Sequence, residues 1–227
     1  MSKAGLTIGL TGVGPRAEIC RVRFIGNRSS GGQGHASALE AASRGAVVHC
    51  VTTRPDGLAG APGLDVVAVE TAAEMAEAVG ARAAGADVVI MAAAVADFRP
   101  ATVATDKIKK DAGPPEILLE PTVDILAELG RSRADSQVLV GFAAETSDLR
   151  QNAAAKLVAK GIDLMVANDV SAPGVGFDHD TNAVVILDAD GGATEVPLAH
   201  KREVAAAVLD AVIALHRTNR STNGDDT

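Results

Sequence analysis

The sequence predicts an α/β fold in which helices cover both faces of a mainly parallel sheet. Short apolar, β-branched runs alternate with alanine-rich helical stretches, the pattern of successive βαβ units. The run 87–94 is apolar after Asp87, and the run 138–143 is apolar as well, as in strands buried on both faces. Near the end, Ala189-Asp190-Gly191-Gly192 separates two such runs and indicates a hairpin. We therefore expect a Rossmann-like, doubly wound sheet with a C-terminal β-hairpin and a final helix.

The expected elements follow one another in a regular order. Strands are expected at 6–10, 47–52, 87–94, 138–143 and 163–167, with the hairpin strands at 183–188 and 193–198. Helices are expected at 31–44, 71–84 and 147–160, each followed directly by glycine, and a last amphipathic helix at 201–217. Residues 1–217 should form one domain, and the polar residues 218–227 a disordered tail. Residues 101–121 lack periodicity, and so long a loop in a compact domain is usually functional or mobile.

Composition excludes several classes of protein. The 227 residues carry a formal net charge of -8, with no basic stripe of the kind that binds nucleic acid. The two cysteines, Cys20 and Cys50, lack metal-type spacing and favour a reducing compartment over a disulfide framework. The start lacks a signal peptide, and no apolar run approaches the roughly 20 residues that span a bilayer. We expect a cytoplasmic protein that binds neither membrane nor nucleic acid.

Two glycine- or alanine-rich segments lie where ligands bind in α/β proteins. Residues 23–34, RFIGNRSSGGQG, lead into a helix, where glycines allow close backbone approach and the helix N-terminus favours anions. The segment lacks the dinucleotide fingerprint and could be a tight turn with serine caps, but Asn27 between Arg23 and Arg28 is less easily explained by packing. Residues 91–100, MAAAVADFRP, follow a buried strand. Asp97 there could bind a ribose, a base or a metal, or simply pair with Arg99.

Two groups of lysines could bind an anion. Lys107, Lys109 and Lys110 lie in the long loop, where they could bind and release a polyphosphate, although a charge run is usually solvated. Lys156 and Lys160 share one helix face, again either beside an anionic partner or simply in water. A further polar segment, 167–171 with 176–177 and 180–182, could be an ordinary strand end with Asx turns.

Taken together, these segments resemble one protein family. The phrases FIGNRSSG, MAAAVADFRP, KIKK, VGFAAET and ANDVS occur in the order and spacing of the phosphopantothenate–cysteine ligase (phosphopantothenoylcysteine synthetase) family, over roughly residues 7–215. The likeness is to the bacterial, CTP-dependent type. It does not extend to the flavin decarboxylase half that usually precedes this domain.

The resemblance implies a ligation reaction in coenzyme A biosynthesis. A carboxylate of 4′-phosphopantothenate attacks the α-phosphate of CTP, giving an acyl-cytidylate and pyrophosphate, and the amine of cysteine then displaces CMP. Attack of one anion on another requires charge neutralisation and alignment, which lysines and Mg²⁺ provide. Bacterial members are typically homodimers with the site near the subunit interface.

Site residues follow from the resemblance position by position. Asn27 corresponds to the residue that holds the acyl-nucleotide, Lys107 to the loop lysine that closes over the triphosphate, and Arg23, Asn27 and Ala94 to positions near the bound acid. The remaining matches are nucleotide-binding positions: Met91, Ala92, Ala93, Asp97, Val123, Asp124, Ile125, Leu126, Phe142, Lys156 and Lys160. The metal ligands stay unassigned.

Departures from the family pattern concentrate in the segment expected to read the acid. They are Val13, Pro15, Ala17, Cys20, Arg21, Gly32 and the pair Thr122-Val123. They leave open a paralogue that uses the same CTP chemistry, for ligation or cytidylyl transfer, on a different acidic substrate. A nucleotide-binding regulatory protein without turnover is the third interpretation, and the presence of Asn27 and Lys107 counts against it.

Overall fold

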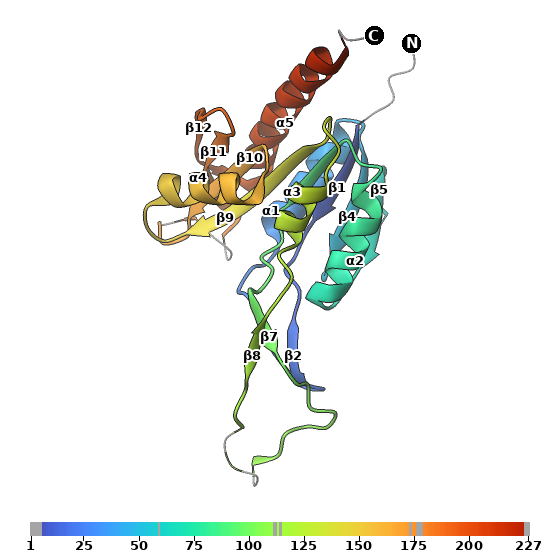
Figure 1. The fold of residues 1–227 in the computed structure, drawn as a ribbon, viewed down its shortest axis with the longest axis vertical. Helices are drawn as coiled ribbons and strands as arrows, with labels where there is room; N and C mark the ends of the chain where they lie inside the picture. The colour runs from blue at the N-terminus through green and yellow to red at the C-terminus, as the bar shows by residue number, and fades with distance from the viewer. Residues whose placement is uncertain are drawn as a thin grey trace.

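The centre of the protein is an eight-stranded sheet in the order β12-β11-β10-β9-β6-β1-β4-β5 (Figure 1). The computed structural model describes residues 6–58, 60–110, 113, 115–172, 174–175 and 179–224. Six strands are parallel, whereas β11 and β12 run antiparallel as the expected hairpin. The strands are β1 (Thr7–Thr11), β4 (Val47–Thr52), β5 (Leu64–Ala68), β6 (Val88–Met91), β9 (Val138–Glu145), β10 (Leu164–Asp169), β11 (Thr181–Asp188) and β12 (Ala193–His200).

Helices cover both faces of this sheet, which confirms the predicted fold class. One core lies between the sheet and the helices α1 (Gly32–Ser43) and α5 (Lys201–Gly224). The other lies beneath α2 (Ala72–Ala83), α3 (Ile125–Ser132) and α4 (Leu149–Lys160). Both cores consist mainly of Ala, Val, Leu and Ile, so small side chains pack closely where aromatic residues are scarce.

The strand order changes direction next to β1. From β1 the chain continues to β4 and β5 on one side, and then returns to β6 on the other. Ligands in open α/β sheets bind beyond the carboxyl ends of the strands at such a switch point. The loops after β1 and β6 are in close contact there, because a side chain on Gly14 would overlap the carbonyl oxygen of Ala94.

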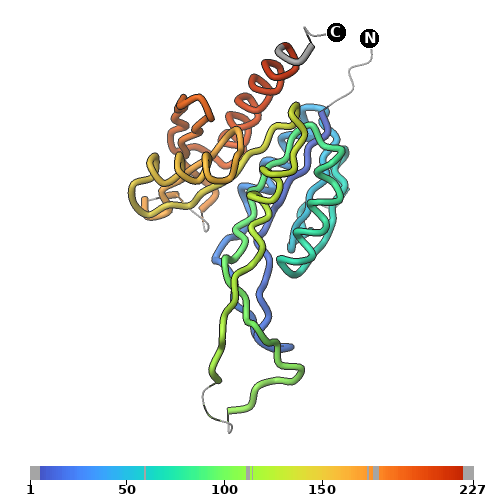
Figure 2. The backbone as a smooth tube through the Cα atoms, in the orientation of Figure 1, coloured from blue at the N-terminus to red at the C-terminus, as the bar shows by residue number. Residues whose placement is uncertain are grey.

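An arm projects from the carboxyl edge of the sheet, as Figures 1 and 2 show. It consists of two small antiparallel sheets, β2 (Ala17–Cys20) with β3 (Arg23–Ile25) and β7 (Phe98–Pro100) with β8 (Leu119–Pro121), and the described part of the loop between β7 and β8. The loop is tied to the β2–β3 hairpin: Ala104 N donates to Ile19 O at 3.0 Å, and Arg23 Nη1 donates to Ile108 O at 3.2 Å.

Most expected elements are present with small shifts at their ends. The strand expected at 87–94 ends at Met91, so Ala92, Ala93 and Ala94 leave the sheet. The description of 101–121 as a loop is wrong at its end, where β8 begins at Leu119. Strand β5, the arm strands and α3 were not expected. The arm strands have three or four residues, too few to show periodicity.

The disordered tail is a second correction. Helix α5 continues to Gly224, so residues 218–224 are helical. Thr218 Oγ1 donates to Ala214 O at 3.2 Å, and Ser221 Oγ donates to Arg217 O at 3.0 Å. These polar side chains bond carbonyls of the preceding turn, which is compatible with an exposed helix. Residues 225–227 lie outside the described residues. None of the described helices combines the length and apolar character that crossing a bilayer requires.

Candidate active site

A cavity of about 370 Å³ lies beyond the carboxyl ends of β6 and β9, where the arm meets α3 and α4. Segments far apart in the sequence line it, and we call it the nucleotide cavity after the residues predicted from sequence to bind a nucleotide that are part of its lining. Its lining includes Asn27, Met91, Ala93, Ala94, Asp97, Val123, Asp124, Ile125, Leu126, Phe142, Lys156 and Lys160. Of the eleven residues predicted to bind nucleotide, ten line this cavity, and Ala92 lines an adjoining one.

Hydrogen bonds fix the backbone that forms one wall. Ala93 N donates to the buried hydroxyl of Thr11 at 3.0 Å, and Val95 N donates to Ala93 O at 3.1 Å. Asn27 Nδ2 donates to Ala94 O at 3.0 Å. Because the side chains at 92–94 are methyl groups, this ordered backbone leaves space for a flat group to lie against it.

Asn27 is exposed and lines the nucleotide cavity. Its backbone is not in the left-handed region, since Asp148 is the one non-glycine residue with positive φ in the described part of the chain. Asn27 therefore does not serve as a left-handed turn residue. Its side chain instead links the loop before α1 to the end of β6.

Each lysine of α4 has a carboxylate partner. Lys156 Nζ lies 2.7 Å from Glu145 Oε1, and Lys160 Nζ lies 2.7 Å from Asp124 Oδ2. Each of the two lysines on this helix face therefore forms an ion pair with a carboxylate, which holds its side chain in place. The charged side chains that line the nucleotide cavity are therefore two acids, Asp97 and Asp124, and the two lysines.

Asp124 connects α3 to α4. It precedes the first residue of α3 and accepts a hydrogen bond from Ala127 N at 3.1 Å. Partial burial raises the pKa of its carboxyl, but hydrogen bonds from Lys160 Nζ and Ala127 N outweigh burial and make the net shift downward. Asp124 therefore stays ionised, and its pair with Lys160 persists well below neutral pH.

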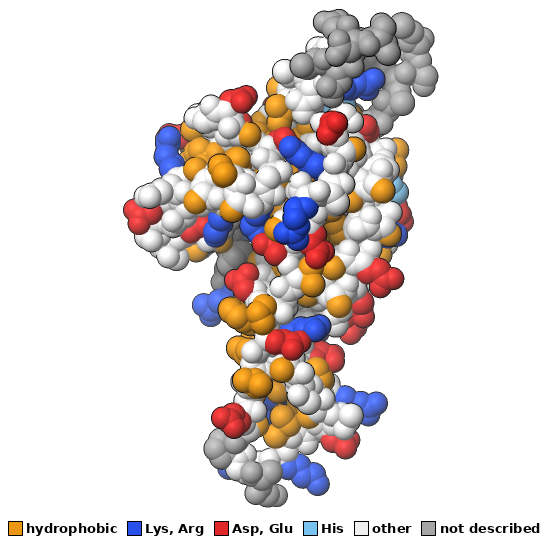
Figure 3. All heavy atoms as spheres, viewed as in Figure 1, with side chains coloured by type: hydrophobic (Ala, Val, Ile, Leu, Met, Phe, Trp, Pro, Cys, Tyr) orange, Lys and Arg blue, Asp and Glu red, His pale blue; other side chains and the backbone are white. Residues whose placement is uncertain are grey.

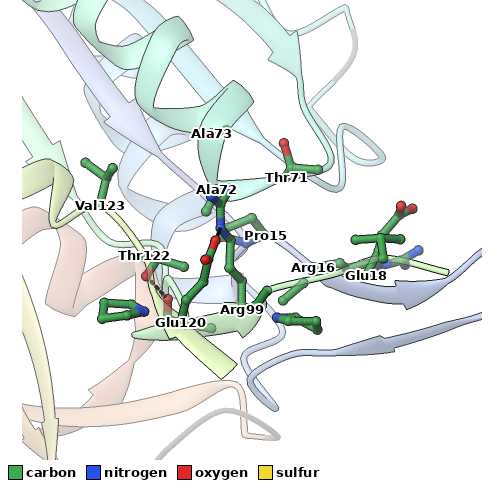
Figure 4. Close-up of a pocket in the computed structure, with 16 residues that line it drawn as sticks. Pro15, Arg16, Glu18, Thr71, Ala72, Ala73, Arg99, Glu120, Thr122 and Val123 are labelled. Carbon is green, nitrogen blue, oxygen red and sulfur yellow. Dashed lines mark hydrogen bonds and ion pairs between the residues drawn. The ribbon is translucent and has the colours of Figure 1, made fainter. Parts of the chain in front are cut away.

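A larger cavity, of about 480 Å³, lies at the base of the arm and adjoins the nucleotide cavity (Figure 4). The two cavities share Ala96, Thr122 and Val123. Thr122 holds this partition together, since its hydroxyl donates to Ala96 O and its N–H to Asp97 O. In Figure 4, Arg99 and Glu120 form one wall, with Nε and Oε1 2.8 Å apart. Pro15 and Thr71 also line this cavity.

A small cavity of about 80 Å³ adjoins the nucleotide cavity at the start of α1. The two share Ala93, Ala94, Phe142 and Ala144. Three amide side chains in the lining of the small cavity are joined by hydrogen bonds: Asn168 Nδ2 donates to Asn182 Oδ1 at 3.3 Å, and Asn182 Nδ2 donates to Gln33 Oε1 at 3.3 Å. We call it the α1 cavity.

Comparison with known proteins relates this geometry to a family. The sequence profile of the DNA/pantothenate metabolism flavoprotein C-terminal domain family matches residues 4–215. The chain belongs to this family. It is 46% identical over 220 residues to the coenzyme A biosynthesis bifunctional protein CoaBC of Mycobacterium tuberculosis H37Rv, covering 92% of this chain and 52% of that protein. The CoaBC protein of Bacillus subtilis strain 168 is 44% identical, covering 90% and 50%.

A solved structure of the same family has the same fold. The C-terminal domain of a coenzyme A biosynthesis bifunctional protein CoaBC superimposes with a TM-score of 0.78 at 37% identity, covering 96% of this chain and all of that one. The chain spans about half the length of the curated relatives it matches. Its likeness is to the C-terminal domain of this family.

Two residues that the family resemblance assigns to catalysis and substrate binding lie away from the nucleotide cavity. Lys107 is exposed in the arm loop, and Arg23 belongs to β3 of the arm. Neither lines the nucleotide cavity as described. Arg23 instead donates a hydrogen bond to the carbonyl oxygen of Ile108, the residue directly after Lys107, so both residues lie in the arm.

Lys201, which lines the α1 cavity, is outside every segment that the sequence singles out. Gln33 and Asn182 line the same cavity and belong to the segments 23–34 and 180–182, although neither is assigned a role from sequence. Asn168 falls in the segment interpreted as a possible strand end. Asp169 does form the expected Asx turn, with Ser171 N 2.9 Å from its Oδ1. Amide side chains at the adjoining ends of β10 and β11 were a usable signal for the pair Asn168 and Asn182. Gly176 and Phe177 of that segment lie outside the described residues.

Proposed function

We propose that the protein is a CTP-dependent ligase that joins 4′-phosphopantothenate to cysteine in coenzyme A biosynthesis. The observation that carries the proposal is the nucleotide cavity, since ten predicted nucleotide-binding residues from four separate stretches of sequence line one space. The two free, buried cysteines are in keeping with a reducing compartment, and we place the reaction in the cytoplasm.

The proposed reaction has two displacements. An oxygen of the acid's carboxylate bonds to the α-phosphorus of CTP, the bond to the bridging oxygen breaks, and pyrophosphate leaves. The amine nitrogen of cysteine then bonds to the acyl carbon, the acyl–oxygen bond breaks, CMP leaves, and the amine loses a proton to solvent. Asn27, at the mouth of the cavity beside Ala94, would hold the acyl-nucleotide during the second displacement.

A magnesium ion fits as a companion of the triphosphate. The described residues contain no group of three or more His, Cys, Asp or Glu that could hold a metal unaided. Mg²⁺ is usually held by one or two carboxylates together with substrate phosphates. Asp97 and Asp124 line the cavity and would supply these carboxylates. When bound, the ion would neutralise phosphate charge.

The first displacement tests the proposal without cysteine. With CTP, Mg²⁺ and 4′-phosphopantothenate alone, radiolabelled pyrophosphate should exchange into CTP, because formation of the acyl-cytidylate is reversible. Exchange should require the acid. A protein that shows no acid-dependent exchange would not use this chemistry.

A second candidate keeps the chemistry and changes the acid. Pro15 and Ala17, two departures from the family pattern, line the 480 Å³ cavity beside the nucleotide cavity. Their sequence neighbours Arg16 and Glu18 also line this cavity. An altered acid-reading segment next to a large cavity favours a paralogue acting on another acidic substrate. Acid-dependent exchange with a panel of carboxylates, but not with 4′-phosphopantothenate, would select it.

CTP should be preferred over ATP, because the segments lining the nucleotide cavity match those of bacterial CTP users. We expect kcat/KM for CTP to exceed that for ATP by about tenfold or more, the range that contacts to base-edge groups provide. Steady-state rates with each nucleotide at equal Mg²⁺ measure this. Comparable turnover with ATP would contradict the assignment.

We further propose a homodimer in which the arm of one protomer reaches the site of its partner. The arm exposes many large apolar side chains, visible in the lower part of Figure 3. They are Val22, Phe24, Phe98, Val103, Ile117, Leu118 and Leu119. Apolar surface of this kind marks an interaction site. A partner cavity would also give Arg23 and Lys107 the substrate contact that their own nucleotide cavity does not offer.

Lys107→Ala should slow the first displacement by weakening binding of the triphosphate. We expect pyrophosphate release in a single turnover to fall by about tenfold, the effect of one charge-assisted contact to phosphate. An unchanged rate would refute the role.

Mixing variants tests whether Lys107 acts on the partner's site. Asn27→Asp and Lys107→Ala should each be impaired alone. In a dimer of one protomer of each variant, one of the two sites combines an intact Asn27 with an intact Lys107 from the other protomer. Random reassortment makes about half of the dimers mixed, so about a quarter of wild-type activity should return. No recovery on mixing would place Lys107 at its own protomer's site.

A further inference from the structure

Two segments that line the nucleotide cavity meet at the base of the arm. The segment 93–97 follows β6 and leads into β7, and the segment 122–126 leads from β8 into α3. Every residue of both segments lines the cavity. Strands β7 and β8 pair antiparallel, with Phe98 opposite Pro121, so the two-stranded ladder of the arm ends where the cavity wall begins. The contacts just beyond this ladder therefore decide how the two segments lie relative to each other.

Thr122 directly follows the ladder and bonds the other segment twice. Its N–H donates to Asp97 O at 2.9 Å, and its hydroxyl donates to Ala96 O. The first bond needs only a backbone N–H, whereas the second requires a hydroxyl on a short side chain. Threonine is also β-branched, so its χ1 angle is restricted and the hydroxyl keeps one direction. The side chain of Thr122 thus ties together residues that are 26 positions apart in the sequence.

The tied segments carry charged groups of the nucleotide cavity. Asp97 directly follows the bonded Ala96, and Asp124 lies two residues after Thr122. Asp124 is itself fixed, because it caps α3 and its carboxylate lies 2.7 Å from Lys160 Nζ. A shift of one segment along the other would therefore move Asp97 relative to this ion pair.

The tie also lies in the wall between two cavities. Ala96, Thr122 and Val123 line both the nucleotide cavity and the cavity of about 480 Å³. Arg99 and Glu120 form an ion pair across the β7–β8 ladder nearby, but both are exposed, and an exposed ion pair contributes little to holding strands together. The half-buried hydroxyl of Thr122 meets less competition from water and constrains the base of the arm more.

We infer that Thr122 is a positioning residue of the nucleotide cavity. Its hydroxyl fixes the two segments against each other and sets the place of Asp97 relative to the ion pair of Asp124 and Lys160. The residue acts through these neighbours rather than by a contact of its own with the nucleotide. The family resemblance assigns it no role, since Thr122 is one of the departures from the family pattern. The inference rests on the proposed function, because it concerns the nucleotide that the cavity is proposed to bind.

Two substitutions of Thr122 test this inference by calorimetric titration with CTP and Mg²⁺. Thr122→Val has nearly the same shape and keeps the N–H bond, but it lacks the hydroxyl, so CTP should bind about fivefold to tenfold more weakly. Thr122→Ser keeps the hydroxyl and should bind CTP within about twofold of wild type. The control is Thr181→Val, which removes a hydroxyl bond to Gly174 O outside the lining of the nucleotide cavity. It should bind CTP normally.

A double variant separates positioning from a general loss of stability. Asp97→Asn should weaken CTP binding, and adding Thr122→Val should weaken it further by less than about twofold, because Thr122 acts through a residue that is already altered. A role in stability alone would lower the melting temperature without changing the affinity measured well below it.

Wild-type affinity for CTP in Thr122→Val, equal weakening in Thr122→Val and Thr122→Ser, or additive losses in the double variant would each overturn the inference. If Thr122→Val does not fold, Thr122→Ala provides the same comparison, and normal CTP binding by that variant overturns the inference. Wild-type protein that binds no CTP refutes the proposed function itself, whereas normal CTP binding by Thr122→Val refutes only the role of the hydroxyl.

Discussion

Asn27→Asp should remove most amide formation and leave the fold intact. The side chain of Asn27 donates to Ala94 O at 3.0 Å and lines the nucleotide cavity. Aspartate cannot donate this bond, and it places a negative charge beside an anionic acyl-nucleotide. Losing one preorganised donor in a site of this kind slows reaction on the order of a hundredfold or more. Quenched-flow measurement of the second displacement should show CTP consumed once and the acyl-cytidylate accumulating.

The stability of the same variant provides the control. Asn27 is exposed, so losing one hydrogen bond should cost about 0.5–1.5 kcal/mol of unfolding free energy. Asn27→Ala removes the donor without adding charge and should be less impaired than Asn27→Asp. If Asn27→Asp forms the amide within about threefold of the wild-type rate, at an unchanged melting temperature, Asn27 serves only to hold the loop at Ala94 in place.

Gly130→Ala should destabilise the protein strongly, although it introduces the best helix-forming residue into α3. A Cβ atom at Gly130 would overlap the backbone carbonyl of Lys160, where α3 meets the end of α4. Backbone atoms cannot rotate away as a side chain can, so the two helices must separate. We expect a loss of about 3 kcal/mol in unfolding free energy, at the upper end of overpacking effects. Denaturant titration measures it.

Gly80→Ala is the matched control, since Gly80 also lies within a helix but has open space around it. The same substitution there should stabilise by about 0.5–1 kcal/mol through helix propensity. For a domain of this size, each kcal/mol moves the melting temperature by about 2–4 °C. Opposite signs are expected, and a stabilised Gly130→Ala would contradict the described contact between α3 and Lys160.

The fold could be predicted from sequence because its strands are buried on both faces. The runs at 47–52 and 138–143 contain little polar character, and glycines punctuate the helices between them. The arm could not be predicted in this way, since β3, β7 and β8 have three residues each and lie largely exposed. The hydrogen bond from Arg23 to Ile108 O also joins parts of the arm that are 85 residues apart, which no local pattern encodes.

The residues that the resemblance assigns to nucleotide binding line one cavity, but the charge pairing around that cavity could not be predicted. Lys156 and Lys160 suggested an anion site, yet their partners Glu145 and Asp124 lie eleven and 36 residues away. The α1 cavity depends on Lys201, which lies 168 residues from Gln33. Contacts of this range arise when distant elements meet at the carboxyl edge of the sheet, and they become visible only in three dimensions.

The most direct test of the account is a complete reaction with purified protein. CTP, Mg²⁺, 4′-phosphopantothenate and cysteine are incubated together, and the products are identified by mass spectrometry. The account predicts CMP, pyrophosphate and phosphopantothenoylcysteine in equal amounts, with no amide when any one substrate is omitted. Intact CTP, or CMP released without the amide, would contradict it.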